Sequence, residues 1–159
     1  MPTREHRYEA TITWTGNPGH GTTKRGDHSR NHEIAVEGKP LIAGSSDPSF
    51  RGDPGRHNPE DLLVASLSAC HMLWYLSLCG KAGIVVMAYV DRAEGTMVED
   101  ASGGGRFTHV VLRPGISLAP GADRDRADAL HHEAHEKCFV SQSVNFPVTV
   151  EPSYHIERA

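Results

Sequence analysis

The sequence predicts an α+β fold in which one long apolar helix accompanies several short β-strands. Residues 8–14 alternate between apolar and polar side chains, as in a strand with one buried face. Residues 58–79 form a nearly uncharged apolar segment that opens with helix-start signals, and residues 84–112 hold further short strand patterns separated by glycines. The expected strands and helices do not alternate strictly along the chain, which favours α+β over a doubly wound parallel sheet.

The N-terminal part is expected to contain two short strands followed by a long loop. Residues 8–14 form the first strand, and Ile34 and Val36 indicate the second. Residues 44–57 are rich in Gly, Pro and Ser and carry Arg51 and Arg56. A structureless loop of this length inside a compact domain is usually functional or mobile.

The central apolar segment is predicted to be a helix. Asn58 suits the N-cap, Pro59 suits the first helical position, and Glu60 places negative charge at the positive end of the helix dipole. Almost no charge follows until about Cys79, and Gly80 marks the end. We therefore expect a helix that is buried on most of its circumference.

The remaining elements complete one domain over residues 1–159, without internal repeats or a linker. The Gly-rich turn at residues 103–105 predicts an antiparallel hairpin between the strands that flank it. The expected elements are strands over residues 84–90, 95–98 and 107–112, a polar helix over residues 122–140 and a closing strand over residues 148–156.

Composition limits the classes of partner. The formal net charge of −4 over 159 residues gives no electrostatic footprint for nucleic acid. The polar N-terminus reads as that of a mature cytoplasmic protein. The central helix has the length of a membrane span, but Ser66, Ser68 and His71 fit a soluble core better, so no membrane association is expected. Three cysteines without export signals argue against standing structural disulfides.

Helix geometry restricts which cysteines can pair. Cys70 and Cys79 lie nine positions apart, on opposite helix faces and about 13 Å along the axis. A disulfide needs Cα atoms about 4.4–6.8 Å apart, so any intrachain disulfide must include Cys138, with either Cys70 or Cys79 as its partner. The small residues Ala65 and Ala69 permit close approach at Cys70, whereas Cys79 stands at a Gly-flanked end that is expected to fray. These neighbours favour Cys70.

A thiol in the middle of a helix gains nothing from the helix N-terminus, so a cation must lower its pKa if it is to react. Arg51 and Arg56, just before the helix, are the nearest suppliers in sequence, and Arg25 and Arg30 in the first long turn are alternatives. Ordinary solvated arginines would give the same pattern, and Glu60 would serve the helix dipole even without a catalytic role.

A metal site is a further alternative. His131, His135 and Cys138 are spaced i, i+4 and i+7, which would place them on one helix face with ligand types that bind Zn²⁺. Only one such ligand segment is apparent, so no metal or other cofactor is expected.

Two segments together resemble the OsmC/Ohr family of osmotically inducible and organic hydroperoxide resistance proteins. The first is Asn58-Pro-Glu-Asp-Leu-Leu leading to Ser-Ala-Cys70, and the second is His135-Glu-Lys-Cys138-Phe-Val-Ser-Gln-Ser-Val. The resemblance spans nearly the whole chain and includes Phe50-Arg-Gly-Asp before the helix. It implies an OsmC-like fold, with antiparallel sheets around a long buried helix in an intertwined homodimer.

The same resemblance implies a thiol-dependent peroxidase of the cytoplasm. Cys70 would be the peroxidatic and Cys138 the resolving residue, Glu60 would support the thiolate, and Arg51 fits the OsmC-like loop pattern best. The Ohr branch instead takes its arginine from the earlier turn. The expected substrate is an organic hydroperoxide and the reductant an external dithiol. A non-catalytic dimer that binds a small apolar ligand or senses stress, and a zinc-binding variant, are the alternatives.

Overall fold

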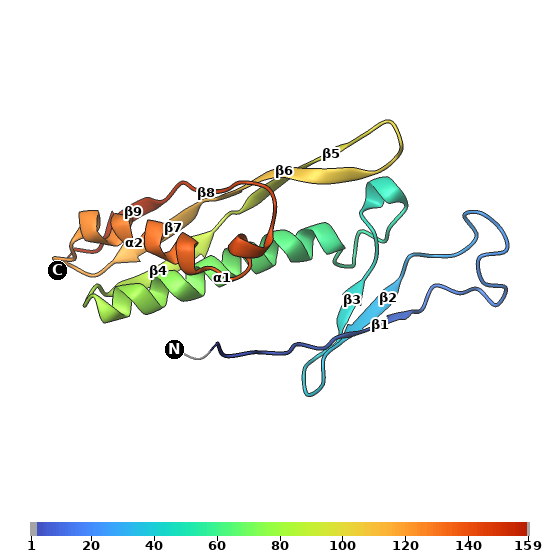
Figure 1. Cartoon of the computed structure of the whole chain (residues 1–159), viewed down its shortest axis with the longest axis horizontal. Coiled ribbons are helices and arrows are strands. Elements are labelled where there is room, and N and C mark those ends of the chain that lie inside the picture. The colour runs from blue at the N-terminus through green and yellow to red at the C-terminus, as the bar shows by residue number, and fades with distance from the viewer. Residues whose placement is uncertain (1–2, 159) are drawn as a thin grey trace. The chain divides into compact units, whose positions relative to one another are not determined.

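The computed structural model describes residues 3–158 and confirms the α+β class. The chain forms two compact units, Met1–Leu62 (the N-terminal unit) and Leu63–Ala159 (the C-terminal unit). Figure 1 shows the elements of each unit along the chain.

A three-stranded antiparallel sheet in the order β1-β2-β3 forms the N-terminal unit. Its strands are β1 (Thr11–Trp14), β2 (His32–Ala35) and β3 (Ile42–Gly44), and a 3-10 turn, η1 (Pro48–Phe50), follows. Both predicted strands are present, although β1 begins at Thr11 rather than at residue 8 and β2 ends before Val36. The expected buried face of β1 is wrong for a single copy, because all of its residues are exposed. Strand β3 was not predicted, because three residues are too few for an alternating pattern.

The long helix α1 spans Pro59–Lys81 and begins as predicted. The Asn58 side-chain oxygen accepts a hydrogen bond from the backbone N–H of Asp61 at 2.8 Å, which satisfies one of the unpaired amides of the first turn. Beyond the helix end, Gly83 has a φ of 73°, a left-handed conformation that glycine adopts without strain. The helix is unbroken between these ends.

One face of α1 is not covered within the chain, so the prediction of burial around most of the circumference is wrong for a single copy. The inner face carries the buried side chains, whereas Leu73 is 64% exposed. A stripe at helical spacing shares this exposure, and we call it the open stripe: Ala65, Ala69, Leu73, Leu76 and Gly80. An apolar sequence indicates that a helix needs cover on several sides, but it does not show that the cover comes from the same chain.

Two three-stranded sheets form the β-structure of the C-terminal unit. The orders are β4-β7-β9 and β5-β6-β8, with antiparallel pairs β4/β7 and β5/β6 and parallel pairs β6/β8 and β7/β9. The β5/β6 pairing confirms the hairpin predicted around the glycine turn. The strands are β4 (Val86–Asp91), β5 (Glu94–Glu99), β6 (Gly105–Leu112), β7 (Pro114–Leu118), β8 (Val148–Val150) and β9 (Ser153–Ile156).

The closing strand differs from its prediction. Residues 148–156 form two strands, β8 and β9, that belong to different sheets. Pro152 lies between them and has no N–H to donate to a strand ladder, so pairing is interrupted there. Strand β7 was not predicted either, because its opening Pro-Gly is typical of a turn.

The second helix, α2, spans Arg124–Lys137 and is shorter than the predicted 122–140. Asp123 caps its start by accepting a hydrogen bond from the Arg126 N–H at 2.9 Å. The helix ends because Cys138 takes an extended conformation with ψ of 105°, and a 3-10 turn, η2 (Ser141–Ser143), follows. The expectation that Cys138 continues the helical face of two histidines is therefore wrong.

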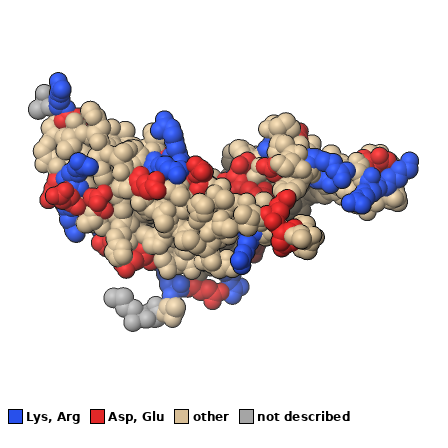
Figure 2. Space-filling view, turned by 90° about the horizontal axis from the view of Figure 1, so that it is seen from above, with Lys and Arg blue, Asp and Glu red and all other residues tan. Residues whose placement is uncertain are grey.

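Apolar packing in the C-terminal unit forms two clusters. One joins α1 to α2, β4, β7 and β9 through buried side chains such as Tyr75, Leu130 and Leu118. The other packs Leu67 of α1 against β6 and β8. Among residues 3–158, α1 is the one helix with the length and composition of a membrane span, and a soluble core helix meets the same criteria. Acidic and basic side chains are interspersed over the face shown in Figure 2.

Candidate active site

Cys70 and Cys138 lie together in the C-terminal unit. Cys70 is half-buried near the middle of α1, and Cys138 is fully buried at the C-cap of α2. The two thiols are hydrogen-bonded to one another and are not joined as a disulfide. The structure thus brings together the two cysteines that the resemblance pairs, from elements 68 positions apart in sequence.

The surroundings of Cys70 act on its thiol in opposite directions. Burial, and then a hydrogen bond that the Cys70 thiol donates to Cys138, raise the pKa of the Cys70 thiol above its ordinary value. Backbone hydrogen bonds from Val140 and Phe139 lower the pKa, but they do not reverse the shift. Among the groups in residues 3–158 that shift this pKa, none is a cation. The single chain therefore holds the thiol in its protonated, less nucleophilic form.

Ser141 orients the sulfur of Cys138. Its hydroxyl donates to Cys138 Sγ at 3.3 Å, and its backbone N–H donates to the same sulfur at 3.5 Å. Both residues are buried. Two donors on one sulfur fix the rotamer of Cys138. No role was predicted for this serine, although the spacing Cys138-x-x-Ser141 lets the turn η2 bring it back to the cysteine.

Aromatic side chains stand beside the thiols. Trp74 lies one helical turn beyond Cys70, and its ring meets that of Phe139 edge-on, with centroids 5.7 Å apart. Phe139 directly follows Cys138 and is 73% exposed. This ring contact joins α1 to the segment that follows α2.

Cys79 has a different environment from the one predicted. It is buried in the core cluster that joins α1 and α2, and it does not lie at a frayed helix end. The backbone N–H of Ile84 donates to its carbonyl oxygen at 2.9 Å, which secures the last turn. Burial also raises the pKa of its thiol. Cys79 is thus an inert core residue in this structure.

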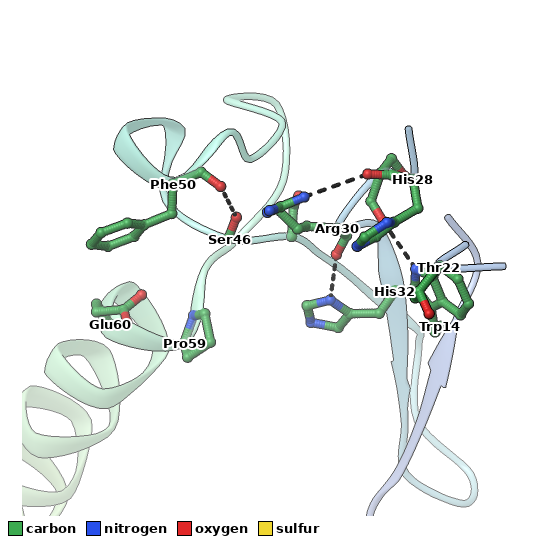
Figure 3. Close-up of a pocket in the computed structure, with 11 residues that line it drawn as sticks. Trp14, Thr22, His28, Arg30, His32, Ser46, Phe50, Pro59 and Glu60 are labelled. Carbon is green, nitrogen blue, oxygen red and sulfur yellow. Dashed lines mark hydrogen bonds between the residues drawn. The ribbon is translucent and has the colours of Figure 1, made fainter. Parts of the chain in front are cut away.

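A pocket of about 410 Å³ lies in the N-terminal unit (Figure 3). Glu60, at the start of α1, and Arg30, before β2, both line it, together with the rings of Trp14 and Phe50. Arg30 also donates to the backbone oxygen of His28 at 3.4 Å. The remaining lining residues are Thr22, His28, Ser29, His32, Ser45, Ser46 and Pro59.

The other arginines considered from the sequence lie outside the lining of this pocket. Arg51 is exposed and caps η1 in a left-handed conformation, with φ of 64°. Arg56 donates to the backbone oxygen of His32 at 3.3 Å and lies 3.6 Å from the carboxylate of Asp53. Arg25 is exposed in the first turn. Of the four arginines, Arg30 alone lines the pocket with Glu60.

The three residues proposed as zinc ligands are not brought together. His131 Nδ1 lies 2.9 Å from His71 Nε2, and Cys138 leaves the helix to meet Cys70. Over residues 3–158, no three His, Cys, Asp or Glu side chains converge in an arrangement that could hold a metal ion. The His71–His131 pair joins positions 60 apart, and nothing in the sequence indicated it.

A helix-borne thiol with a second thiol at hydrogen-bonding distance defines a protein with the components of two-cysteine redox chemistry. Residues 52–153 match the family described as OsmC-like protein, and the chain belongs to this family. Peroxiredoxin OsmC of Escherichia coli (strain K12) is 26% identical over 102 residues, which are 64% of this chain and 69% of that protein. This relative supports a peroxidase-type role at the level of the family.

Solved structures share the fold over nearly the whole chain. An OsmC-like protein of unknown function from Vibrio cholerae is 30% identical, with a TM-score of 0.83 over 93% of this chain and 99% of that one. An organic hydroperoxide resistance protein from Elizabethkingia anophelis is 20% identical, with a TM-score of 0.69 over 98% of this chain and 100% of that one. These structures confirm the OsmC-like fold predicted from the sequence.

Proposed function

We propose that this protein is a cofactor-free thiol peroxidase that reduces organic hydroperoxides. The Cys70 thiolate attacks the distal peroxide oxygen, the O–O bond breaks, and the alkoxide leaves as alcohol after taking up a proton, which makes Cys70 a sulfenic acid. The sulfur of Cys138 then displaces hydroxide from that sulfenic acid, which releases water and forms a disulfide. An external dithiol returns both thiols. The chemistry requires no metal or organic cofactor, and we place it in the cytoplasm.

The observation that carries the proposal is the contact between Cys70 and Cys138. A sulfenic acid must meet a thiol before a second peroxide over-oxidises it, and here the thiol is already adjacent. The donors from Ser141 hold Cys138 Sγ in place for this step.

The aromatic surroundings favour an organic substrate over hydrogen peroxide. Trp74 and the exposed ring of Phe139 provide apolar surface beside the thiols. Apolar contact contributes about 25 cal/mol per Å² of surface removed from water, so an alkyl or aryl group gains binding energy that hydrogen peroxide does not.

Glu60 and Arg30 would act on the Cys70 of a second chain. Glu60 and Cys70 are ten residues apart on the unbroken helix α1, about 15 Å along its axis, which a Glu side chain does not span. Because no cation among residues 3–158 lowers the pKa of Cys70, a partner that supplies Arg30 would provide the missing charge. The open stripe of small and apolar residues on α1 suits close packing against the same helix of a second copy.

Turnover with cumene hydroperoxide and a dithiol tests the proposed function. Wild-type protein is expected to consume the peroxide catalytically, Cys70→Ser to consume none, and Cys79→Ser to match the wild type. The Cys79 variant is a matched control, because it removes a thiol from the same helix. A folded wild-type dimer without turnover would favour the non-catalytic alternative.

Subunit mixing tests the shared site. Glu60→Ala and Cys70→Ser chains are each expected to be inactive, whereas a verified heterodimer has one site in which both residues are wild type. Partial recovery of activity is expected. If no activity returned, the carboxylate would have to act within its own chain, against the helix geometry.

A further inference from the structure

A buried pair of histidines links α1 to α2. His71 is fully buried on α1 and His131 is 5% exposed on α2. Their rings are nearly parallel, with 4° between the planes, and His71 Nε2 lies 2.9 Å from His131 Nδ1. At this distance one imidazole donates a hydrogen bond and the other accepts it.

The surroundings hold the pair in one orientation. The ring of His131 stacks on that of Tyr75, one helical turn beyond His71, with centroids 3.9 Å apart and 9° between the planes. The ring of Tyr154 on β9 closes a further side at 6.3 Å. Neither His71 Nδ1 nor His131 Nε2 has a hydrogen-bond partner among the residues that the structure describes.

Such a pair is a poor source of stability. Two imidazoles lose their hydration in the core, and two ring nitrogens remain without a protein partner. Apolar residues of similar volume at both positions would stabilise the unit as well or better. What a hydrogen bond adds is direction, since apolar contacts between two helices tolerate small sliding motions and a 2.9 Å hydrogen bond does not.

The pair lies beside the redox thiols along both helices. His71 directly follows Cys70, and His131 precedes Cys138 by seven residues. Seven residues of helix are a stiff rod of about 10 Å, so the register of α2 at His131 sets the position of its C-terminal end. Apolar contacts also join the two helices, through residues such as Leu78 and Leu130.

We propose that His71 and His131 are positioning residues that hold the C-terminal end of α2 so that Cys138 Sγ stays within reach of Cys70 Sγ. They touch neither sulfur as a reactant, and they act by fixing the register between the two helices. A displacement of about 1 Å in a reacting group can cost up to about a hundredfold in rate. This inference deepens the proposed function and rests on the same pair of thiols.

A peroxide-free measurement separates this inference from the peroxidase activity. Oxidised glutathione accepts two electrons from the pair: Cys70 forms a mixed disulfide and releases one reduced glutathione, then Cys138 displaces the second and closes the intramolecular disulfide. Alkylation and mass spectrometry in defined glutathione buffers measure the rate at which the Cys70–Cys138 disulfide closes. The same data give the effective concentration of one thiol at the other.

Paired variants test the positioning role. In His71→Leu/His131→Leu, closure is expected to slow at least tenfold, while the free energy of unfolding is unchanged or higher. In His71→Gln/His131→Asn, the amide groups occupy the places of Nε2 and Nδ1, and closure is expected to recover to within threefold of the wild type. If the two histidines had a purely structural role, the rate of disulfide closure would fall only in variants whose free energy of unfolding also falls.

Two results would overturn the inference: wild-type closure in the folded leucine variant, or closure in the amide variant as slow as in the leucine variant. If the leucine variant does not fold, the same comparison is made between His131→Leu and His131→Asn. A wild-type protein that closes with glutathione but does not turn over peroxide would refute the peroxidase proposal and leave the positioning role intact.

Discussion

Acidification from pH 7 to pH 5 is expected to destabilise the protein through the His71–His131 pair. Burial is the main reason that the pKa of His71 falls from its ordinary value of 6.5 to about 4 and that of His131 to about 3. Both imidazoles are therefore neutral in the folded state at pH 5. In the unfolded chain they take up protons below pH 6.5, so acid favours unfolding.

The expected size of the effect follows from these values. The stabilisation is fully present above pH 6.5 and is lost as the pH falls toward the folded pKa values. Since one pKa unit corresponds to 1.36 kcal/mol, the 1.5 units between pH 6.5 and pH 5 cost about 2 kcal/mol for each histidine and about 4 kcal/mol for both. That loss is a large share of the stability of an ordinary domain, about 5–15 kcal/mol.

Neighbouring groups modify this effect without changing its sign. His135 on α2 lowers the pKa of His71 further, and Asp91 on β4 partly opposes that shift. The tyrosines that face the pair, Tyr75 and Tyr154, have pKa values raised by burial and stay neutral throughout this range.

Urea unfolding at pH 7 and pH 5, followed by circular dichroism at one fixed protein concentration, measures the loss. Wild-type protein is expected to lose about 4 kcal/mol, and His71→Leu/His131→Leu to lose little. His132→Gln is the control, because His132 is exposed on the same helix and its removal is expected to keep the wild-type difference. Equal losses in the wild type and the double leucine variant would refute this reasoning.

Three further predictions concern the resolving sulfur, the arginine that supports the thiolate and the open stripe of α1. Ser141→Ala removes one hydrogen-bond donor to Cys138 Sγ, which is worth about 1 kcal/mol, so disulfide closure measured by rapid quenching should slow about fivefold. Ser143→Ala is the matched control, because the Ser143 hydroxyl donates to the backbone oxygen of Phe139 instead. The sequence predicts that Arg51→Ala slows the reaction with peroxide more than Arg30→Ala does. The lining of the pocket favours the reverse, with the pKa of the Cys70 thiol about one unit higher in Arg30→Ala than in the wild type. Equal rates in the two variants would exclude both arguments. Leu73→Asp on the open stripe should give a monomer by light scattering, and this monomer should be inactive toward peroxide. An active monomer would exclude a shared site.

The sequence contained enough local information to predict the long helix and the hairpin. Asn58 signalled the helix start through a side-chain hydrogen bond to a residue three positions away, and glycines marked the β5/β6 turn. The parallel pairings β6/β8 and β7/β9 join segments more than thirty residues apart, and local patterns do not show which distant strands pair. The split of residues 148–156 depended on this long-range pairing as well as on Pro152.

The candidate site was predicted unevenly for the same reason. Helix geometry excluded a disulfide between Cys70 and Cys79, and the resemblance then paired Cys70 with Cys138, which the structure places in contact. The extended conformation of Cys138 ended α2 early, which also removed the zinc alternative. The burial of Cys79 and the contact of His71 with His131 arise from the packing of α2 on α1, which no local pattern specifies.

Mass spectrometry with peptide mapping after one equivalent of cumene hydroperoxide tests the central claim most directly. The account predicts one intramolecular Cys70–Cys138 disulfide that dithiothreitol reverses, with Cys79 reduced. In Cys138→Ser the oxidation should stop as a sulfenic acid on Cys70 and proceed to sulfinic acid with excess peroxide. A disulfide between Cys79 and Cys138, or first oxidation at a residue other than Cys70, would contradict the account.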